Sequence, residues 1–222
     1  MKLSVIILTY NVEDEIIPAI KSSQFADEII AVDTGSTDGT LDICRKNGVK
    51  IVHTTTDSFS KWRNDGAKVA KGEWLLYLDS DERIPVKLAK EILATIQSPQ
   101  HSAYTISRYE VFLGKHLNHW GDPRVLRFMK RSALKRWEGK LHEQPKIDGT
   151  IGDLRQQMVH LSHKNIDEKL PNTLLWSKTE AKMLYVLKAG SRLSIRCSAS
   201  LSLTSGFGRC RENLLSKRPT IT

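Results

Sequence analysis

Short apolar runs alternate with longer helical patterns along the first half of the chain. The apolar runs, which predict buried strands, lie at residues 4–8, 28–32, 50–53 and 74–79. Apolar side chains at helical spacing lie between them, at residues 13–21, 41–47 and 60–70. Asn11 is a residue type that caps the start of a helix, and Gly48 is one that ends a helix. The alternation predicts an α/β fold with a Rossmann-like, mostly parallel sheet flanked by helices.

The second half of the chain has a weaker pattern. It predicts a helix at residues 86–96 and strands at residues 103–112 and 125–130, and the rest is not assigned. We expect one catalytic domain over residues 1–187, with a first half (1–103) and a small extension (104–187). Residues 188–222 form an atypical basic tail rich in serine and arginine.

A cluster of carboxylates follows the fourth predicted strand. The run at residues 73–82 reads EWLLYLDSDE, so Asp79 and Asp81 stand where a buried strand ends. In open α/β sheets, ligands bind at such strand ends. Two carboxylates one residue apart can hold a divalent cation, and a cation can hold a diphosphate.

A polar loop follows the second predicted strand. It begins at Asp33 and reads DTGSTDGT, which is typical either of a tight turn with a helix cap or of a nucleotide site. The sequence contains neither G-x-G-x-x-G after the first strand nor G-x-x-x-x-G-K-[ST]. A metal ion would therefore have to hold the phosphates.

The charge of the chain is unevenly distributed. The net charge is +9, with −3 in residues 1–103, +6 in residues 104–142 and +6 in residues 188–222. A basic second half indicates an anionic partner such as a phosphorylated lipid, or else a solvated basic face. The three cysteines form no CxxC pair and no apolar run has transmembrane length, so we expect a cytoplasmic protein. We expect no nucleic-acid partner.

The motifs resemble those of the family 2 glycosyltransferases, which have the GT-A fold. The resemblance rests on four segments in the family's order: VIILTYN at 5–11, IAVDTGSTDGT at 30–40, Arg63-Asn64, and WLLYLDSDE at 74–82. RFMKR at 127–131 and WEGKLHE at 137–143 are most similar to the lipopolysaccharide-core β-1,4-glucosyltransferase group. The likeness covers about residues 1–185, and it implies that residues 1–103 are a nucleotide-sugar half and residues 104–187 an acceptor half.

The resemblance implies an inverting transfer of a sugar, glucose in that group, from a UDP-sugar to a glycolipid or polysaccharide such as the lipopolysaccharide inner core. It implies that Mn²⁺ or Mg²⁺ is bound by Asp79 and Asp81 as a DxD pair. By the same correspondence, the nucleotide-binding residues are Thr9, Glu13, Asp33, Arg63 and Asp79.

Two residues of the second half complete the predicted site. Glu143 matches the family's carboxylate in the acceptor half and is the expected catalytic base, with Glu138 as the alternative. His160 is a candidate further metal ligand, since histidine commonly binds metals such as manganese. Without the resemblance, both are also ordinary surface residues.

Two other functions remain open. One is a non-catalytic or inactivated sugar-nucleotide-binding protein, favoured by the unusual tail, which a frameshift near residue 188 would explain. The other is a sugar-phosphate nucleotidyltransferase, although Thr9 to Glu13 replaces the glycine-rich loop of that class. The lipopolysaccharide group continues with an amphipathic region that could lie against a membrane. The sequence does not predict an oligomeric state.

Overall fold

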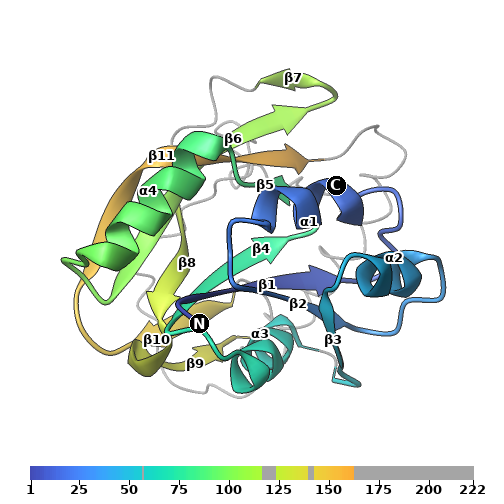
Figure 1. Ribbon diagram of the computed structural model, residues 1–222, viewed down its shortest axis with the longest axis horizontal. Helices are drawn as coiled ribbons and strands as arrows, with labels where there is room; N and C mark the ends of the chain where they lie inside the picture. The colour runs from blue at the N-terminus through green and yellow to red at the C-terminus, as the bar shows by residue number, and fades with distance from the viewer. Residues whose placement is uncertain (57, 117–123, 140–142, 163–222) are drawn as a thin grey trace, which may run out of the picture.

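The computed structural model describes residues 1–56, 58–116, 124–139 and 143–162, and these form an α/β fold (Figure 1). The helices are α1 (Ile16–Ser23), α2 (Thr40–Lys46), α3 (Phe59–Val69) and α4 (Val86–Gln97), with a 3₁₀ turn at Arg131–Ala133. The strands are β1 (Leu3–Thr9), β2 (Glu28–Asp33), β3 (Lys50–His53), β4 (Trp74–Asp79), β5 (Glu82–Arg83), β6 (Ala103–Phe112), β7 (Lys115–His116), β8 (Arg124–Lys130), β9 (Leu134–Glu138), β10 (Gln144–Ile147) and β11 (Ile151–Ser162).

One large mixed sheet organises the chain. Its order is β3-β2-β1-β4-β8-β6-β11-β5, and β7 pairs with β6. Strands β3, β2, β1 and β4 are parallel, as predicted for the first half. Strand β8 is antiparallel to both β4 and β6, so it joins the second half of the chain directly to the strand that carries the carboxylate cluster. Strands β9 and β10 form a separate antiparallel pair.

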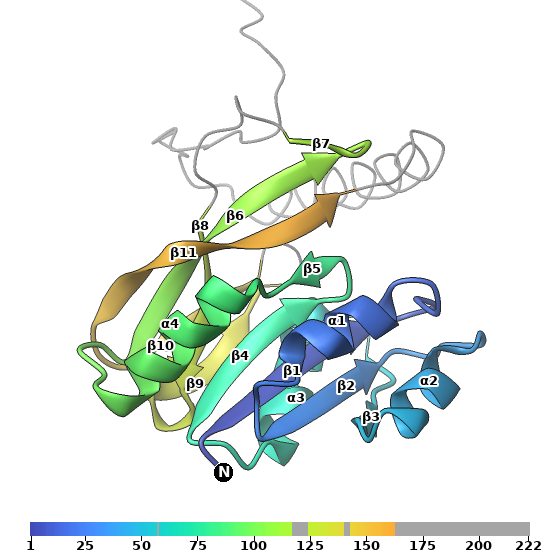
Figure 2. The ribbon, with the colours of Figure 1, turned by 45° about the horizontal axis from the view of Figure 1, so that its top comes forward.

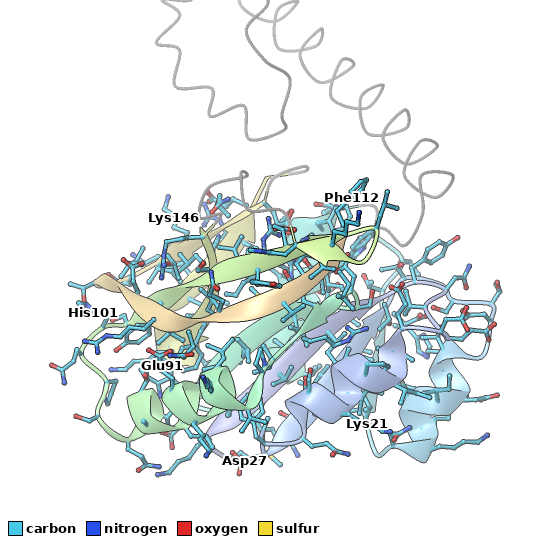
Figure 3. All side chains as sticks on the ribbon, turned by 90° about the horizontal axis from the view of Figure 1, so that it is seen from above. Lys21, Asp27, Glu91, His101, Phe112 and Lys146 are labelled. Carbon is cyan, nitrogen blue, oxygen red and sulfur yellow. The ribbon has the colours of Figure 1, made fainter. Side chains whose placement is uncertain are left out.

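Both faces of the sheet are covered, which explains the continuous apolar runs of β1 and β4. Helices α1, α2 and α4 pack on one face through Ile16, Ile20, Cys44, Leu88 and Ile92. Helix α3 and the β9–β10 pair cover the other face. In Figure 2, the paired strands β6 and β11 lie above the parallel strands β1, β2 and β4. Figure 3 shows Lys21 of α1 and Glu91 of α4 on the opposite side of the sheet from Lys146 of β10.

Helix α3 lies unusually close to the sheet. A Cβ atom on Gly66 would stand 2.5 Å from Cγ2 of Ile6 and 2.9 Å from Cγ2 of Val32, so a larger residue would push the helix away. This close packing positions the neighbouring residues of α3 over the strand ends.

The structure corrects one predicted cap. Asn11 does not cap α1, because the N-cap position is Glu15 and its side chain makes no capping hydrogen bond. Asn11 instead has a φ of 48°, and its Oδ1 accepts a hydrogen bond from the backbone N–H of Thr37 at 2.8 Å. Gly48 follows α2 with a φ of 70°, as its predicted role requires.

The predicted tail at 188–222, and the part of the acceptor half after residue 162, lie outside the described residues. Within the described ranges, no helix combines the length and the apolarity needed to cross a bilayer.

Candidate functional site

A cavity of about 610 Å³ opens at the carboxyl ends of β1 and β4. These ends meet because the two strands are parallel and adjacent, with Leu8 opposite Asp79. The cavity is lined by Leu8, Thr9, Tyr10, Val12, Thr34, Phe59, Trp62, Asp79, Ser80, Asp81 and His160. Four of the predicted site residues are therefore together in its wall, at the sheet edge where α/β folds bind ligands.

Asp79 lies between two arginines. Its Oδ1 accepts a hydrogen bond from Nη2 of Arg63 at 2.9 Å, and its Oδ2 accepts one from Nη2 of Arg127 at 2.8 Å. Burial opposes ionisation of Asp79, but the guanidinium groups of Arg127 and Arg63 outweigh it and hold the pKa of Asp79 well below its usual range. Arg127 was not predicted as a site residue, because its place beside Asp79 depends on the pairing of β8 with β4.

Arg63 connects Asp79 to the predicted catalytic base. Its side chain is 2% exposed, and its Nε donates to Oε1 of Glu143 at 2.8 Å. The guanidinium also packs over the ring of Trp137, with 5.0 Å from Cζ to the ring centroid. Arg63 thus holds two carboxylates from the two halves of the chain, and it is not among the residues that line the cavity.

Trp137 is fixed from α3 by two reciprocal hydrogen bonds. Asn64 donates from Nδ2 to the carbonyl oxygen of Trp137 at 3.0 Å, and its Oδ1 accepts from the N–H of Trp137 at 2.8 Å. The ring is buried against Tyr77 and Arg63. Trp137 is therefore part of the support of the site.

Asp81 and His160 face each other across the cavity wall. Nε2 of His160 lies 3.2 Å from Oδ2 of Asp81, and Nδ1 lies 2.5 Å from Oε2 of Glu110. Burial alone lowers the pKa of His160, but hydrogen bonds to Asp81 and Glu110 outweigh it and raise that pKa to about 10.

The donor set can be tested for a divalent cation. Within the described residues, no three His, Cys, Asp or Glu side chains stand together as a ready metal site. Asp81 and His160 nevertheless supply an oxygen and a nitrogen that already face each other, and the second nitrogen of His160 contacts a carboxylate, as is usual for metal-bound histidines. Asp81 and His160 therefore fit a divalent cation. Asp79 is less available as a ligand, because each of its oxygens already accepts from an arginine.

Glu82 is buried directly behind the two aspartates. Its Oε2 accepts the N–H of Asp79 at 2.9 Å, which fixes the backbone at the end of β4. Burial, followed by the charge of Asp79, raises the pKa of Glu82 to about 7. Glu82 was not predicted as a site residue, although it belongs to the carboxylate cluster after β4.

The remaining predicted nucleotide residues shape the neighbouring loops. Asp33 accepts hydrogen bonds from the N–H groups of Gly35 (3.0 Å) and Ser36 (3.2 Å), and Glu13 accepts one from Gly39 at 2.7 Å. Both carboxylates therefore stabilise the loop between β2 and α2, and neither is in the cavity wall. Thr9, which is in that wall, donates to the carbonyl oxygen of Val32 at 3.2 Å.

Comparisons with known proteins agree with this architecture. Residues 4–156 match the sequence profile of Glycosyl transferase family 2. The chain is 36% identical over 148 residues to a TPR repeat-containing protein of Synechococcus elongatus, which covers 65% of this chain and 35% of that protein. It is 38% identical over 97 residues to a poly(ribitol-phosphate) beta-glucosyltransferase of Bacillus spizizenii, which covers 38% of this chain and 15% of that protein.

The fold also matches a solved structure. The crystal structure of S. aureus TarS 1-349 in complex with UDP-GlcNAc superposes with a TM-score of 0.56 and 22% identity, over 74% of this chain and 60% of that one. The predicted GT-A-like α/β fold is thereby confirmed. The chain spans only about a third of the cyanobacterial relative and less than two thirds of the TarS fragment.

Proposed function

Because the chain belongs to glycosyl transferase family 2, we propose that it transfers a hexosyl group, with inversion, from a UDP-sugar to a hydroxyl group of an anionic glycan. The observation that carries this proposal is the cavity at the ends of β1 and β4, where Asp79, Asp81 and His160 share one wall with three aromatic residues. A cavity of about 610 Å³ is within the usual range for small-molecule and cofactor sites.

The donor would occupy this cavity. Tyr10, Phe59 and Trp62 offer aromatic faces for a base, and the carboxylates lie at the other part of the wall. Asp81 and His160 would hold Mn²⁺ or Mg²⁺, with Asp79 beside them. When bound, such a cation neutralises the diphosphate leaving group. Arg63 and Arg127 would keep Asp79 ionised and in place, and Glu13 and Asp33 would hold the loop that closes the nucleotide side.

Glu143 would remove the proton from the acceptor hydroxyl. Its side chain is 12% exposed, and the hydrogen bond from Arg63 fixes its position relative to Asp79. A carboxylate so placed can act as a general base while the acceptor oxygen attacks the anomeric carbon from the face opposite the nucleotide. The division into a donor half (1–103) and an acceptor half (104–187) follows from this assignment of roles.

The proposed acceptor can be narrowed to phosphorylated glycans. The Bacillus relative is named for poly(ribitol-phosphate), and the second-half motifs resemble enzymes of the lipopolysaccharide core. Both acceptors are phosphorylated glycans, which agrees with the basic second half of the chain. We therefore assign a phosphorylated glycan as acceptor, with the reaction at the cytoplasmic face of the membrane, and glucose or N-acetylglucosamine as the sugar.

The test is a panel of donors and acceptors with product detection by mass spectrometry. UDP-glucose and UDP-N-acetylglucosamine would each be incubated with Mn²⁺ and either poly(ribitol-phosphate) or a lipopolysaccharide-core acceptor. We expect product with one combination, and we expect Glu143→Gln to reduce turnover about 100- to 10,000-fold. Glu138→Gln tests the alternative base. Glu138 is an exposed carboxylate paired with Arg136, so we expect this variant to keep turnover, and loss of turnover there with full activity of Glu143→Gln would assign the base to Glu138.

Two results would replace the proposal. UDP-sugar binding without product from any acceptor would indicate a non-catalytic binding protein. Formation of UDP-sugar from UTP and a sugar phosphate would indicate a nucleotidyltransferase. Full activity of Glu143→Gln would show that another group is the base.

A further inference from the structure

Glu110 and His160 are opposite each other in the pairing of β6 with β11. This direct register places Oε2 of Glu110 2.5 Å from Nδ1 of His160, and the other ring nitrogen, Nε2, faces Asp81 at 3.2 Å. Glu110 is 5% exposed, although it is a carboxylate in the middle of a strand. A buried carboxylate needs a partner, and the imidazole of His160 provides it.

We infer that Glu110 is a positioning residue for His160, which fixes the ring so that Nε2 is directed toward Asp81 and the cation that the two residues would share. This inference rests on the proposed function, because that function assigns Asp81 and His160 as ligands. A cation that binds at Nε2 takes the place of the proton there, which is released to solvent, and the carboxylate at Nδ1 keeps the remaining proton of the ring on that side. The lone pair of Nε2 is then directed to the cation.

Glu110 is itself held in place. Its Oε1 lies 3.1 Å from Nε of Arg108, and the guanidinium of Arg108 reaches to within 3.8 Å of Oε1 of Glu82. Glu82 in turn accepts the N–H of Asp79. Ion pairs of Arg108 with Glu110 and Glu82, and the hydrogen bond from Asp79 to Glu82, therefore connect the surroundings of His160 to the end of β4.

The main chain adds to this arrangement. The N–H of Leu161 donates to the carbonyl oxygen of Asp81 at 2.9 Å, so β11 is attached to the acidic segment beside His160. The backbone therefore brings Asp81 and His160 near each other, and rotation of the His160 side chain is what remains to be fixed. Glu110 contacts the nitrogen that settles this rotation.

A purely structural role predicts a different outcome. A carboxylate that only ties β6 to β11 would act like Asp153, which is opposite Thr105 in the same pair of strands and bonds to its hydroxyl. The side chain of Asp153 is 69% exposed and is not in the cavity wall. Asp153→Ala is therefore a matched control that removes a cross-strand carboxylate without touching His160.

The experiment measures the affinity of the full chain for Mn²⁺ alone, by electron paramagnetic resonance, without nucleotide or acceptor. The variants are Glu110→Ala, Glu110→Gln, His160→Ala and Asp153→Ala, each first checked for folding by circular dichroism. We expect Glu110→Ala to weaken Mn²⁺ binding about 10- to 100-fold, since loss of such an outer partner has this effect in metalloproteins. Glu110→Gln keeps an acceptor oxygen of the same shape and should recover part of the affinity, and Asp153→Ala should bind as the wild type does.

The outcomes separate the inference from the proposed function. If His160→Ala weakens Mn²⁺ binding while both folded Glu110 variants bind like the wild type, the positioning role is wrong and the ligand assignment stands. If His160→Ala binds Mn²⁺ as the wild type does, the ligand assignment itself fails, and the inference fails with it. If Glu110→Ala does not fold, Glu110→Gln decides. Its carboxamide is uncharged, so we expect a Mn²⁺ affinity between those of the wild type and His160→Ala, and an affinity equal to that of the wild type would overturn the positioning role.

Discussion

Removal of the Arg63 charge is expected to destabilise the fold strongly. Arg63 is almost fully buried and donates to two carboxylates, Asp79 at 2.9 Å and Glu143 at 2.8 Å. Replacement by methionine keeps much of the apolar volume over Trp137 but leaves these carboxylates without one of their partners.

The size of the effect follows from these contacts. Breaking a buried ion pair by removing one partner costs about 3–5 kcal/mol. Arg127 remains 2.8 Å from Asp79 and 4.0 Å from Glu143, so part of the charge stays compensated. We therefore expect Arg63→Met to lower the free energy of unfolding by about 3 kcal/mol, at the lower end of that range.

The assay is urea denaturation of the wild type, Arg63→Met and Lys68→Met at neutral pH. Lys68 is on the same helix and pairs with Asp65 at 2.7 Å, but its side chain is 73% exposed, so its loss should cost less than about 1 kcal/mol. The two guanidinium groups lower the pKa of Asp79, so their contribution is present above the ordinary pKa of an aspartate and is lost at lower pH. The defect of Arg63→Met should therefore shrink as the pH falls below about 4. Equal stability of Arg63→Met and the wild type, or an equal defect in Lys68→Met, would refute this reasoning.

Three further outcomes follow from the structure. Asn64→Ala should lower the free energy of unfolding by about 1–3 kcal/mol in urea denaturation, because it leaves the N–H and C=O of Trp137 without their partner; an unchanged midpoint would contradict this. Gly66→Ala should cost about 1–3 kcal/mol by the same measurement, because its Cβ would meet Ile6 and Val32, and a stabilised variant would show that α3 can move freely. The pKa of His160 is raised to about 10, so the charged ring stabilises the fold fully below about pH 6.5, and this contribution is lost as the pH rises toward 10. The difference in free energy of unfolding between the wild type and His160→Gln should therefore shrink over that range. A constant difference would contradict the raised pKa of His160.

Local patterns predicted the strands and the acidic segment well. The apolar run before Asp79 corresponds to β4, and residues 50–53 and 103–112 match β3 and β6 at both ends. Strand β4 could be predicted because it is a central strand buried on both faces and so has a continuous apolar sequence. The cap assigned to Asn11 was wrong because its side chain bonds to a loop 26 residues away, which no local pattern reveals.

The connections within the site could not be predicted from local patterns. Arg127 reaches Asp79 only because β8 is antiparallel beside β4, and Glu110 meets His160 only through the register of β6 with β11. Strands β9, β10 and β11 were not predicted, because they are largely polar and lack a clear alternation. The sequence therefore indicated which residue types were available, and the pairing of distant strands determined which of them contact each other.

The central claim is that Asp81 belongs to the site of a metal-dependent sugar transfer. The direct measurement is the transfer of radiolabelled sugar from a UDP-sugar to a phosphorylated glycan acceptor, with Mn²⁺ present, by the wild type and by Asp81→Asn at equal folded concentration. We expect the wild type to transfer sugar when Mn²⁺ is present, and we expect Asp81→Asn to lose turnover and to gain none from added Mn²⁺. Turnover in Asp81→Asn equal to that of the wild type, with the same dependence on Mn²⁺, would contradict it.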